Sequence, residues 1–298
     1  MQEYQKDKLK EYIENSELIN ISENFRIRLS KDLLENYNKG LYNDRLVIMG
    51  EHIKLINDLG IKYPANAKPI FYFYIVPTDN FRELLNFPSH RNYVAGGKPV
   101  PSYDLDGFNM AYGVSENVLT NKKNYNIMYV VNNIHEFAHL VHSMFFNKDK
   151  FISEGFAEAL PLYTMDYESQ FDEHREMLQS LQENQVLSAQ QLIELADKSN
   201  FDAGAVIPNK SCGFDISYIS SYLFVRGCLE KIVDNYNLNR IQATQKFLEI
   251  VRESQRTHQR LIFDIANAIG LPQDELLNGK SMQFKVIKGL SRFKTKSI

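Results

Sequence analysis

Residues 135–139 of the chain read HEFAH, with a histidine at each end and a glutamate after the first. Histidines four residues apart lie on one face of an α-helix, one turn from each other, so both imidazoles can reach a single ion. The neighbouring apolar residues, among them Ile134, Val141 and Phe145, recur at the spacing of a stripe on the opposite side of such a helix. The pentapeptide therefore predicts a helix that presents two metal ligands, His135 and His139.

Glu136 lies inside the pentapeptide, near the predicted metal but not on it. A carboxylate in this position can take a proton from a water molecule that a zinc ion activates. Two imidazoles and a carboxylate are also a set of ligands that suits zinc well. We therefore predict a zinc site with Glu136 as the general base of a hydrolytic reaction.

A catalytic zinc site needs a third protein ligand and one open position. His142 lies one turn further along the same rigid helix and cannot easily close the same tetrahedron. Glu154 and Glu158 lie four residues apart in the segment SEGFAE, so both face the same way on a helix that Ser153 can cap. One of the two glutamates can bind the metal, while the other can hold a ligating histidine by its second nitrogen.

The pentapeptide and the segment FISEGFA (151–157) together resemble the gluzincins, zinc peptidases of the peptidase-MA-like type with H-E-x-x-H on one helix and a glutamate ligand on the next. FISEGFA is similar to the W-L-N-E-G-F-A segment of the aminopeptidase N-like family. The resemblance implies that Glu154 is the third ligand of one Zn²⁺ per chain. It also implies that Glu158, by its spacing, orients the first histidine, as an acidic residue does in thermolysin-like enzymes.

A predicted helix over residues 216–235 extends the resemblance. Its start is similar to the family segment in which a tyrosine donates a hydrogen bond to the tetrahedral intermediate. The resemblance implies this role for Tyr218, with Tyr222, one turn later, as the alternative. Residues 220–221 are Ser-Ser where the family has Lys-Gly.

The segment GVSEN (113–117) is similar to the family segment G-x-M-E-N, although the methionine is missing. In the family this segment lies on an edge strand beside the metal. The resemblance implies that Gly113 and Glu116 bind substrate, with Glu116 on a free amino group. The strand over residues 108–114 would then pair with the extended substrate backbone.

Hydrophobic spacing divides the chain into a strand-bearing and a helical part. Apolar residues recur at helical spacing over residues 3–60 and again beyond about residue 125. KPIFYFYIVP (68–77) and residues 108–114 are typical of strands, and residues 86–107, rich in proline and glycine, of loop and short hairpin. These patterns predict an α+β fold.

We expect an N-terminal helical segment, 1–64, followed by a metallopeptidase domain, 65–298. The domain is expected to have a β-containing part, 65–125, and a helical part, 126–298. The resemblance implies that it is a thermolysin-like zincin domain: a small mixed-sheet lobe and a helical lobe with the active-site cleft between them, preceded by extra N-terminal helices.

Composition limits the class of protein. The chain has 298 residues, of which 44% are hydrophobic and 24% charged, which is ordinary for a globular protein. A formal net charge of -3 gives no overall basic character that would indicate nucleic acid binding. Two cysteines favour reduced thiols in a cytosolic setting, although one bridge is possible. The most apolar run, 70–76, is shorter than the ~20 residues of a membrane span, so we expect a cytoplasmic protein.

The resulting hypothesis is a zinc metallopeptidase acting on a peptide or protein substrate. Aminopeptidase and specific endopeptidase activity both remain open, and the oligomeric state is not given by the sequence. One rival is a zincin-fold binding module that has lost catalysis, which should lack Glu136 or a ligand. Another is a zinc hydrolase of a non-peptide ester or epoxide, which could use the same three ligands.

Overall fold

The computed structural model describes residues 3–23, 25–59, 70–77, 98–100, 109–115, 134–135, 138–139, 150–197, 206–208, 213–254 and 258–290. The chain forms two compact units, Met1–Glu136 and Phe137–Ile298, here called the N-terminal and C-terminal units. The N-terminal unit holds a sheet, and the described part of the C-terminal unit is almost entirely helical. The predicted α+β class is therefore confirmed at this coarse level.

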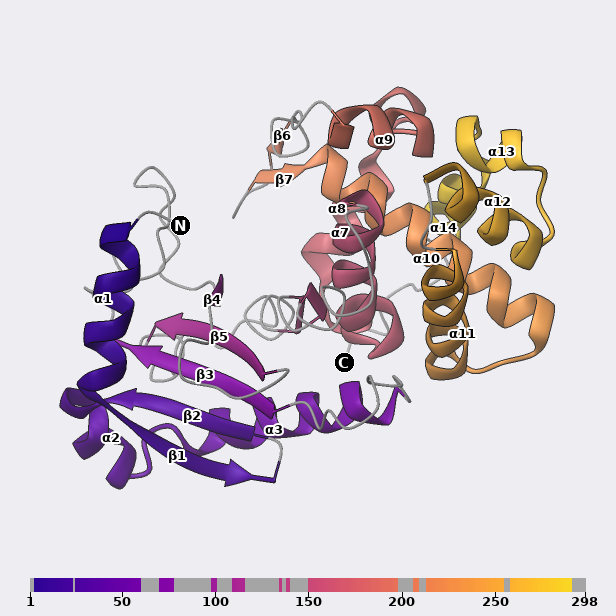
Figure 1. The fold of residues 1–298 in the computed structure, drawn as a ribbon. Helices are drawn as coiled ribbons and strands as arrows, with labels where there is room; N and C mark the ends of the chain where they lie inside the picture. The colour runs from indigo at the N-terminus through magenta and orange to yellow at the C-terminus, as the bar shows by residue number, and fades with distance from the viewer. Residues whose placement is uncertain are drawn as a thin grey trace. The chain divides into compact units, whose positions relative to one another are not determined.

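The N-terminal unit is built on a five-stranded mixed sheet with the strand order β1-β2-β3-β5-β4 (Figure 1). Strands β2, β3 and β5 run parallel, while β1 and β4 are antiparallel to their neighbours. The elements are α1 (Glu3–Glu14), β1 (Ser16–Ser22), β2 (Phe25–Ser30), η1 (Lys31–Leu33), α2 (Leu34–Asn38), α3 (Asn43–Asp58), β3 (Ile70–Val76), β4 (Lys98–Val100) and β5 (Asn109–Ser115).

Two of these strands correct the helical prediction for residues 3–60. That prediction is right for α1 and α3, but residues 16–30 form the antiparallel pair β1 and β2. In β2 the side chains of Phe25, Ile27 and Leu29 are fully buried, while the arginines between them are half-buried. Alternation of this kind has the period of a strand, and it outweighs the sparse helical spacing read across the same residues.

The two strands predicted from the apolar and aromatic runs are both present. KPIFYFYIVP contains β3, and the strand predicted over residues 108–114 is β5. Every residue of β5 is paired with β3, from Ile70 with Asn109 to Val76 with Ser115. The predicted boundary at residue 64 falls inside this unit, since strands from both sides of it share one sheet.

Strand β5 is an internal strand of the sheet, which corrects the expectation of an edge strand beside the metal. Its residues Ala111, Tyr112 and Gly113 pair on their second side with β4. Both edges of the backbone are therefore occupied by neighbouring strands at these residues. A substrate strand cannot add to β5 there while β4 is in place.

The C-terminal unit is centred on the long helix α10, which matches the helix predicted over residues 216–235 (Figure 1). Helices α7, α9, α11, α12 and α14 pack against it. The elements are α7 (Lys150–Ala159), η2 (Leu160–Thr164), η3 (Tyr167–Gln170), α8 (Asp172–Ser180), η4 (Glu183–Gln185), α9 (Ala189–Asp197), β6 (Val206–Pro208), β7 (Gly213–Asp215), α10 (Ile216–Tyr236), α11 (Arg240–Glu253), α12 (His258–Ile269), α13 (Gln273–Asn278) and α14 (Ser281–Leu290).

Helix α7 continues directly into η2, which is a π-helical turn. The widened turn follows from Pro161, which has no backbone N–H to donate to the preceding turn. The amide of Met165 instead donates to the carbonyl of Leu160, five residues back, over 3.1 Å. All five residues of η2 are buried, so the end of α7 is fixed within the core of this unit.

In the part of the chain that the structure describes, no helix has the length and apolar character needed to cross a membrane.

Candidate metal centre

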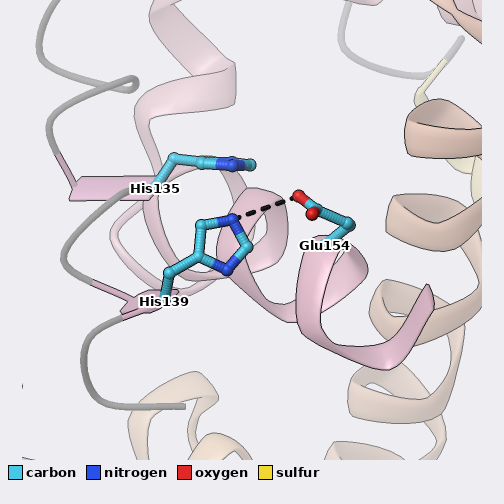
Figure 2. A group of neighbouring side chains, drawn as sticks. All are labelled: His135, His139 and Glu154. Atoms are coloured by element: carbon cyan, nitrogen blue, oxygen red, sulfur yellow. Dashed lines mark ion pairs between the residues drawn. The ribbon is translucent and has the colours of Figure 1, made fainter. Parts of the chain in front are cut away.

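His135 and His139 are brought together with Glu154 (Figure 2). Each residue offers one ligand atom, a ring nitrogen or a carboxylate oxygen, and these three atoms all lie within 4.8 Å of one another. Among the described residues, no other group of three or more His, Cys, Asp or Glu side chains brings its ligand atoms together in this way. The three residues that the sequence pattern selected as ligands can therefore hold a metal ion.

Within the group, His139 and Glu154 form an ion-pair contact. The Nε2 atom of His139 lies 3.1 Å from Oε2 of Glu154, and Figure 2 shows the ring directed at the carboxylate. The two side chains are 20% and 11% exposed, respectively. A carboxylate this well buried against an imidazole is a site where a cation would compensate the lost hydration.

Helix α7 supplies Glu154 and begins at Lys150, three residues before Ser153. The expected capping role of Ser153 is therefore wrong, because Ser153 lies inside the helix. Its hydroxyl instead lies 3.1 Å from Nδ1 of His139, within hydrogen-bonding distance. The buried apolar residues on either side, Phe151 and Phe156, hold α7 in the core of the C-terminal unit.

Glu158 lies one turn after Glu154 on α7, and its side chain is half-buried. Its predicted role towards a ligating histidine stays a prediction. The hydrogen-bond partner found at a second ring nitrogen is Ser153, on His139. The sequence held one signal for this role of Ser153: it directly precedes Glu154 on the same helix. Consecutive helical residues can reach two atoms of one ring.

Other predicted site residues lie outside the described residues. These are the general base Glu136 and the substrate-binding Glu116. His142, which was set aside as a ligand, also lies outside them. Gly113 is described, and lies in β5 opposite Tyr74 of β3 and Lys98 of β4.

Tyr218 lies in the first turn of α10 and is half-buried. The start of this helix is fixed by Asp215, whose side chain accepts a hydrogen bond of 2.9 Å from the backbone amide of Ser217. An acidic N-cap stabilises the exposed amides of the first turn. The position of Tyr218 along the helix is therefore well defined.

Tyr222, the alternative to Tyr218, belongs to the core of the unit. It is 1% exposed, and its hydroxyl donates a hydrogen bond of 2.6 Å to Oε1 of Glu168. Burial raises the pKa of Tyr222 well above its ordinary value, so the hydroxyl stays protonated as a donor. A phenol committed to a buried carboxylate cannot serve a substrate, and Tyr222 is excluded as the alternative.

The same carboxylate is the centre of a buried ionic cluster that the sequence did not reveal. Glu168 forms an ion pair with Arg226, and its Oε1 lies 3.6 Å from Nδ1 of His174. Burial alone would raise the pKa of Glu168, but His174, Arg226 and Tyr222 together lower it to about 2. The cluster joins η3 and α8 to α10, because each of these elements contributes one or more of its members.

Cys228 is a free thiol buried in α10. For this residue, the expectation of a reduced cysteine is confirmed. Burial raises its pKa. The thiol is therefore a poor nucleophile and serves as a small apolar residue of the core.

No protein-family model matches the chain, and no curated protein matches its sequence.

Proposed function

We propose that the chain is a zinc-dependent peptidase of the gluzincin type, with a thermolysin-like zincin domain. His135, His139 and Glu154 would hold one zinc ion. The observation that carries the proposal is the convergence of their ligand atoms within 4.8 Å, from the HEFAH pentapeptide and the following helix α7. Two imidazole nitrogens and one carboxylate oxygen are a donor set that suits a catalytic zinc ion and leaves one position open.

A zinc ion in such a site lowers the pKa of a water molecule to ~7 and polarises the substrate carbonyl. Glu136, which follows His135 in the chain, would take the proton from the water and pass it to the leaving amine. Tyr218 would donate a hydrogen bond to the carbonyl oxygen as negative charge develops on it.

The remaining assigned residues would act on orientation and binding. Glu158 would orient His135, and Glu116 would contact the substrate near its amino end, whereas Gly113 is paired with neighbouring strands on both sides and is not assigned a substrate contact. Retention of all three ligands together with Glu136 supports catalysis over a zincin-fold module that only binds. The chemistry of the ligands fits a peptide as well as an ester or epoxide, so the substrate class rests on the resemblance to the gluzincins.

The first test is metal content, measured by elemental analysis of the purified wild type and the Glu154→Ala variant. We expect about one zinc per chain in the wild type and little or none in the variant. A matched control is Glu176→Ala, which removes an exposed carboxylate from α8 and should leave the zinc content unchanged. A folded wild-type protein that takes up no zinc, even after addition of the metal, would overturn the proposal.

The second test compares substrates of the zinc-loaded protein. Peptide libraries with free and with acetylated N-termini are offered alongside simple esters and epoxides. Acetylation should block an aminopeptidase and spare an endopeptidase. Turnover of the esters or epoxides without peptide cleavage would favour the non-peptide hydrolase instead.

A further inference from the structure

The sheet of the N-terminal unit has two edge strands, and they differ in how well they are protected. Strand β4 has only three residues, among them Lys98 and Pro99. Short length, lysine and proline are features that keep an edge strand from pairing with another chain. Strand β1, at the other edge, has seven residues, no proline and Glu17 as its single charged residue (Figure 1). β1 is therefore the edge to which a further strand can be added.

The backbone of β1 has hydrogen-bonding groups on its outer side. The carbonyl of Asn15 accepts a hydrogen bond of 3.2 Å from the amide of Lys31, so residue 15 directs its backbone towards β2. This direction alternates from one residue of an antiparallel strand to the next. The amides and carbonyls of Ser16, Leu18 and Asn20 therefore point away from β2. Within the described part of the chain, no residue forms a hydrogen bond with these outward groups.

The side chains along this stretch leave the edge accessible. Glu17, Leu18 and Asn20 are exposed, and Ser16 and Ile19 are half-buried. Leu18 is 39% exposed, which is unusual for a large apolar side chain in this protein. The outer edge of β1 thus combines unpaired backbone groups with an apolar side chain at its centre.

We propose that β1 is an interaction surface on which two copies of the chain pair antiparallel, about a two-fold axis at Leu18. In this register, Leu18 lies opposite Leu18 of the second copy, and Ser16 lies opposite Asn20 of the second copy. These are the residues whose backbone groups point outward, so each pair exchanges two hydrogen bonds. The two sheets then form one continuous sheet across the axis.

A second copy is the favoured partner because the strand is complementary to itself. Two-fold pairing satisfies every outward amide and carbonyl from Ser16 to Asn20, and the exposed Leu18 side chains cover each other. Glu17 lies opposite Ile19 of the second copy, so no charged residue of β1 directly faces a like charge. The inference concerns a surface of the N-terminal unit and does not depend on the proposed zinc chemistry.

The extent of the pairing determines how strong the association is. The stretch from Ser16 to Asn20 is short compared with the roughly 20–30 residues that each partner contributes to a standard interface. We therefore expect a dimer that forms and dissociates with protein concentration.

The experiment measures the mass of the purified chain by analytical ultracentrifugation from about 1 µM to about 500 µM, a range that covers weak association. The mass of the wild type should rise from one chain towards two. Leu18→Lys places two like charges opposite each other and should weaken the association at least tenfold, as an order-of-magnitude estimate. Val47→Lys changes an exposed apolar residue of α3 in a similar way and should leave the association unchanged.

Cysteine cross-linking tests the register. The Cα atoms of a hydrogen-bonded antiparallel pair lie about 5.5 Å apart, within the range that a disulfide can bridge. Leu18→Cys should therefore form a covalent dimer under mild oxidation. In Asn20→Cys, the two new thiols lie on opposite sides of the axis and should not join. Wild-type protein, which has two cysteines of its own, gives the background under the same oxidation.

Three results would overturn the proposal. The first is a wild type that keeps the mass of one chain at every concentration, a result that needs no variant to fold. The second is a dimer that Leu18→Lys weakens no more than Val47→Lys does, which would place the interface elsewhere. The third is equal cross-linking of Leu18→Cys and Asn20→Cys, which would exclude a two-fold axis at Leu18.

Discussion

A β-carbon on residue 155 would lie 2.3 Å from the carbonyl oxygen of Ser221, so Gly155 of α7 lies directly against the backbone of α10. The same atom would lie 2.7 Å from a methyl carbon of Val225. Such separations are far below van der Waals contact, and the obstacle is backbone rather than a movable side chain. Helices α7 and α10 can approach this closely only because residue 155 has no side chain.

Replacement of Gly155 by alanine should therefore destabilise the protein. We expect a loss of about 1–3 kcal/mol in the free energy of unfolding, typical of added volume in a packed core. Because Glu154 precedes this position, zinc affinity should fall as well. Urea unfolding followed by circular dichroism measures the first effect, and chelator competition the second.

Gly289→Ala is the matched control, since it makes the same change in the helix α14. No atom lies within 4 Å of the β-carbon that it would add. The higher helix propensity of alanine should leave stability unchanged or raise it by up to about 1 kcal/mol. Equal losses in both variants would show that the close approach at Gly155 is not the cause.

The ligands of the candidate centre could be predicted from the sequence because their spacing is a local property. His135 and His139 are one helical turn apart whatever surrounds them. Glu154 needed a second cue, the resemblance of FISEGFA to the gluzincin segment, because the spacing in SEGFAE left Glu154 and Glu158 both open. The partners of these ligands are set by side-chain packing between elements, which is why Ser153 was assigned to a helix cap and not to His139.

The fold was predictable where one pattern dominates a segment. The aromatic run of β3 and the long apolar spacing of α10 gave correct elements. Residues 16–30 were misassigned because short alternating strands were read within a longer helical window. The ionic cluster around Glu168 could not be foreseen, since its members come from three elements that only the tertiary fold brings together.

Glu136→Gln should retain zinc and abolish turnover. The amide keeps the size of the side chain but cannot take a proton from water. We expect activity below a few per cent of the wild type, with about one zinc per chain by elemental analysis. More activity than this would remove Glu136 as the base. His142→Ala is the companion variant and should keep its zinc, whereas His135→Ala should lose it.

Arg226→Met should destabilise the C-terminal unit by about 3–5 kcal/mol, because the carboxylate of Glu168 would then be buried without its main counter-charge. Arg226 also contacts Glu230, with 3.1 Å between Nε and Oε1, but that glutamate side chain is 31% exposed. Glu230→Gln should therefore cost less than about 1 kcal/mol. Chemical denaturation of both variants at pH 7 measures the two losses in the free energy of unfolding. Similar losses in both would contradict the importance of the buried pair of Arg226 and Glu168.

The N-terminal unit should lose stability in mild acid because of His52 on α3. This residue is 4% exposed, and burial lowers its pKa from 6.5 to about 4. At a pH between these two pKa values, His52 binds a proton more readily in the unfolded chain than in the folded protein. Stability is therefore complete above pH 6.5 and falls as the pH is lowered to about 4, by up to about 3 kcal/mol.

Urea unfolding at a series of pH values between 7 and 4 tests this dependence, with His52→Phe as the variant that cannot titrate. The variant should show a flatter profile over this range. The titration of Glu168 does not obscure the result. Its pKa is lowered from 4.5 to about 2, so its contribution to the stability of the protein is lost only between these two pH values. An unchanged profile in His52→Phe would assign the acid sensitivity to another group.

Ser153, Glu154 and Gly155 follow one another in α7 and contact three different groups: the Nδ1 side of His139, its Nε2 side, and the backbone of α10. Successive helical residues are turned by about 100° from one another. Inserting or deleting a single residue between Ser153 and Gly155 would turn at least one of the three by about 100° away from its partner. The length of this short stretch of α7 is therefore fixed by three contacts at once, and changes of chain length are expected outside it.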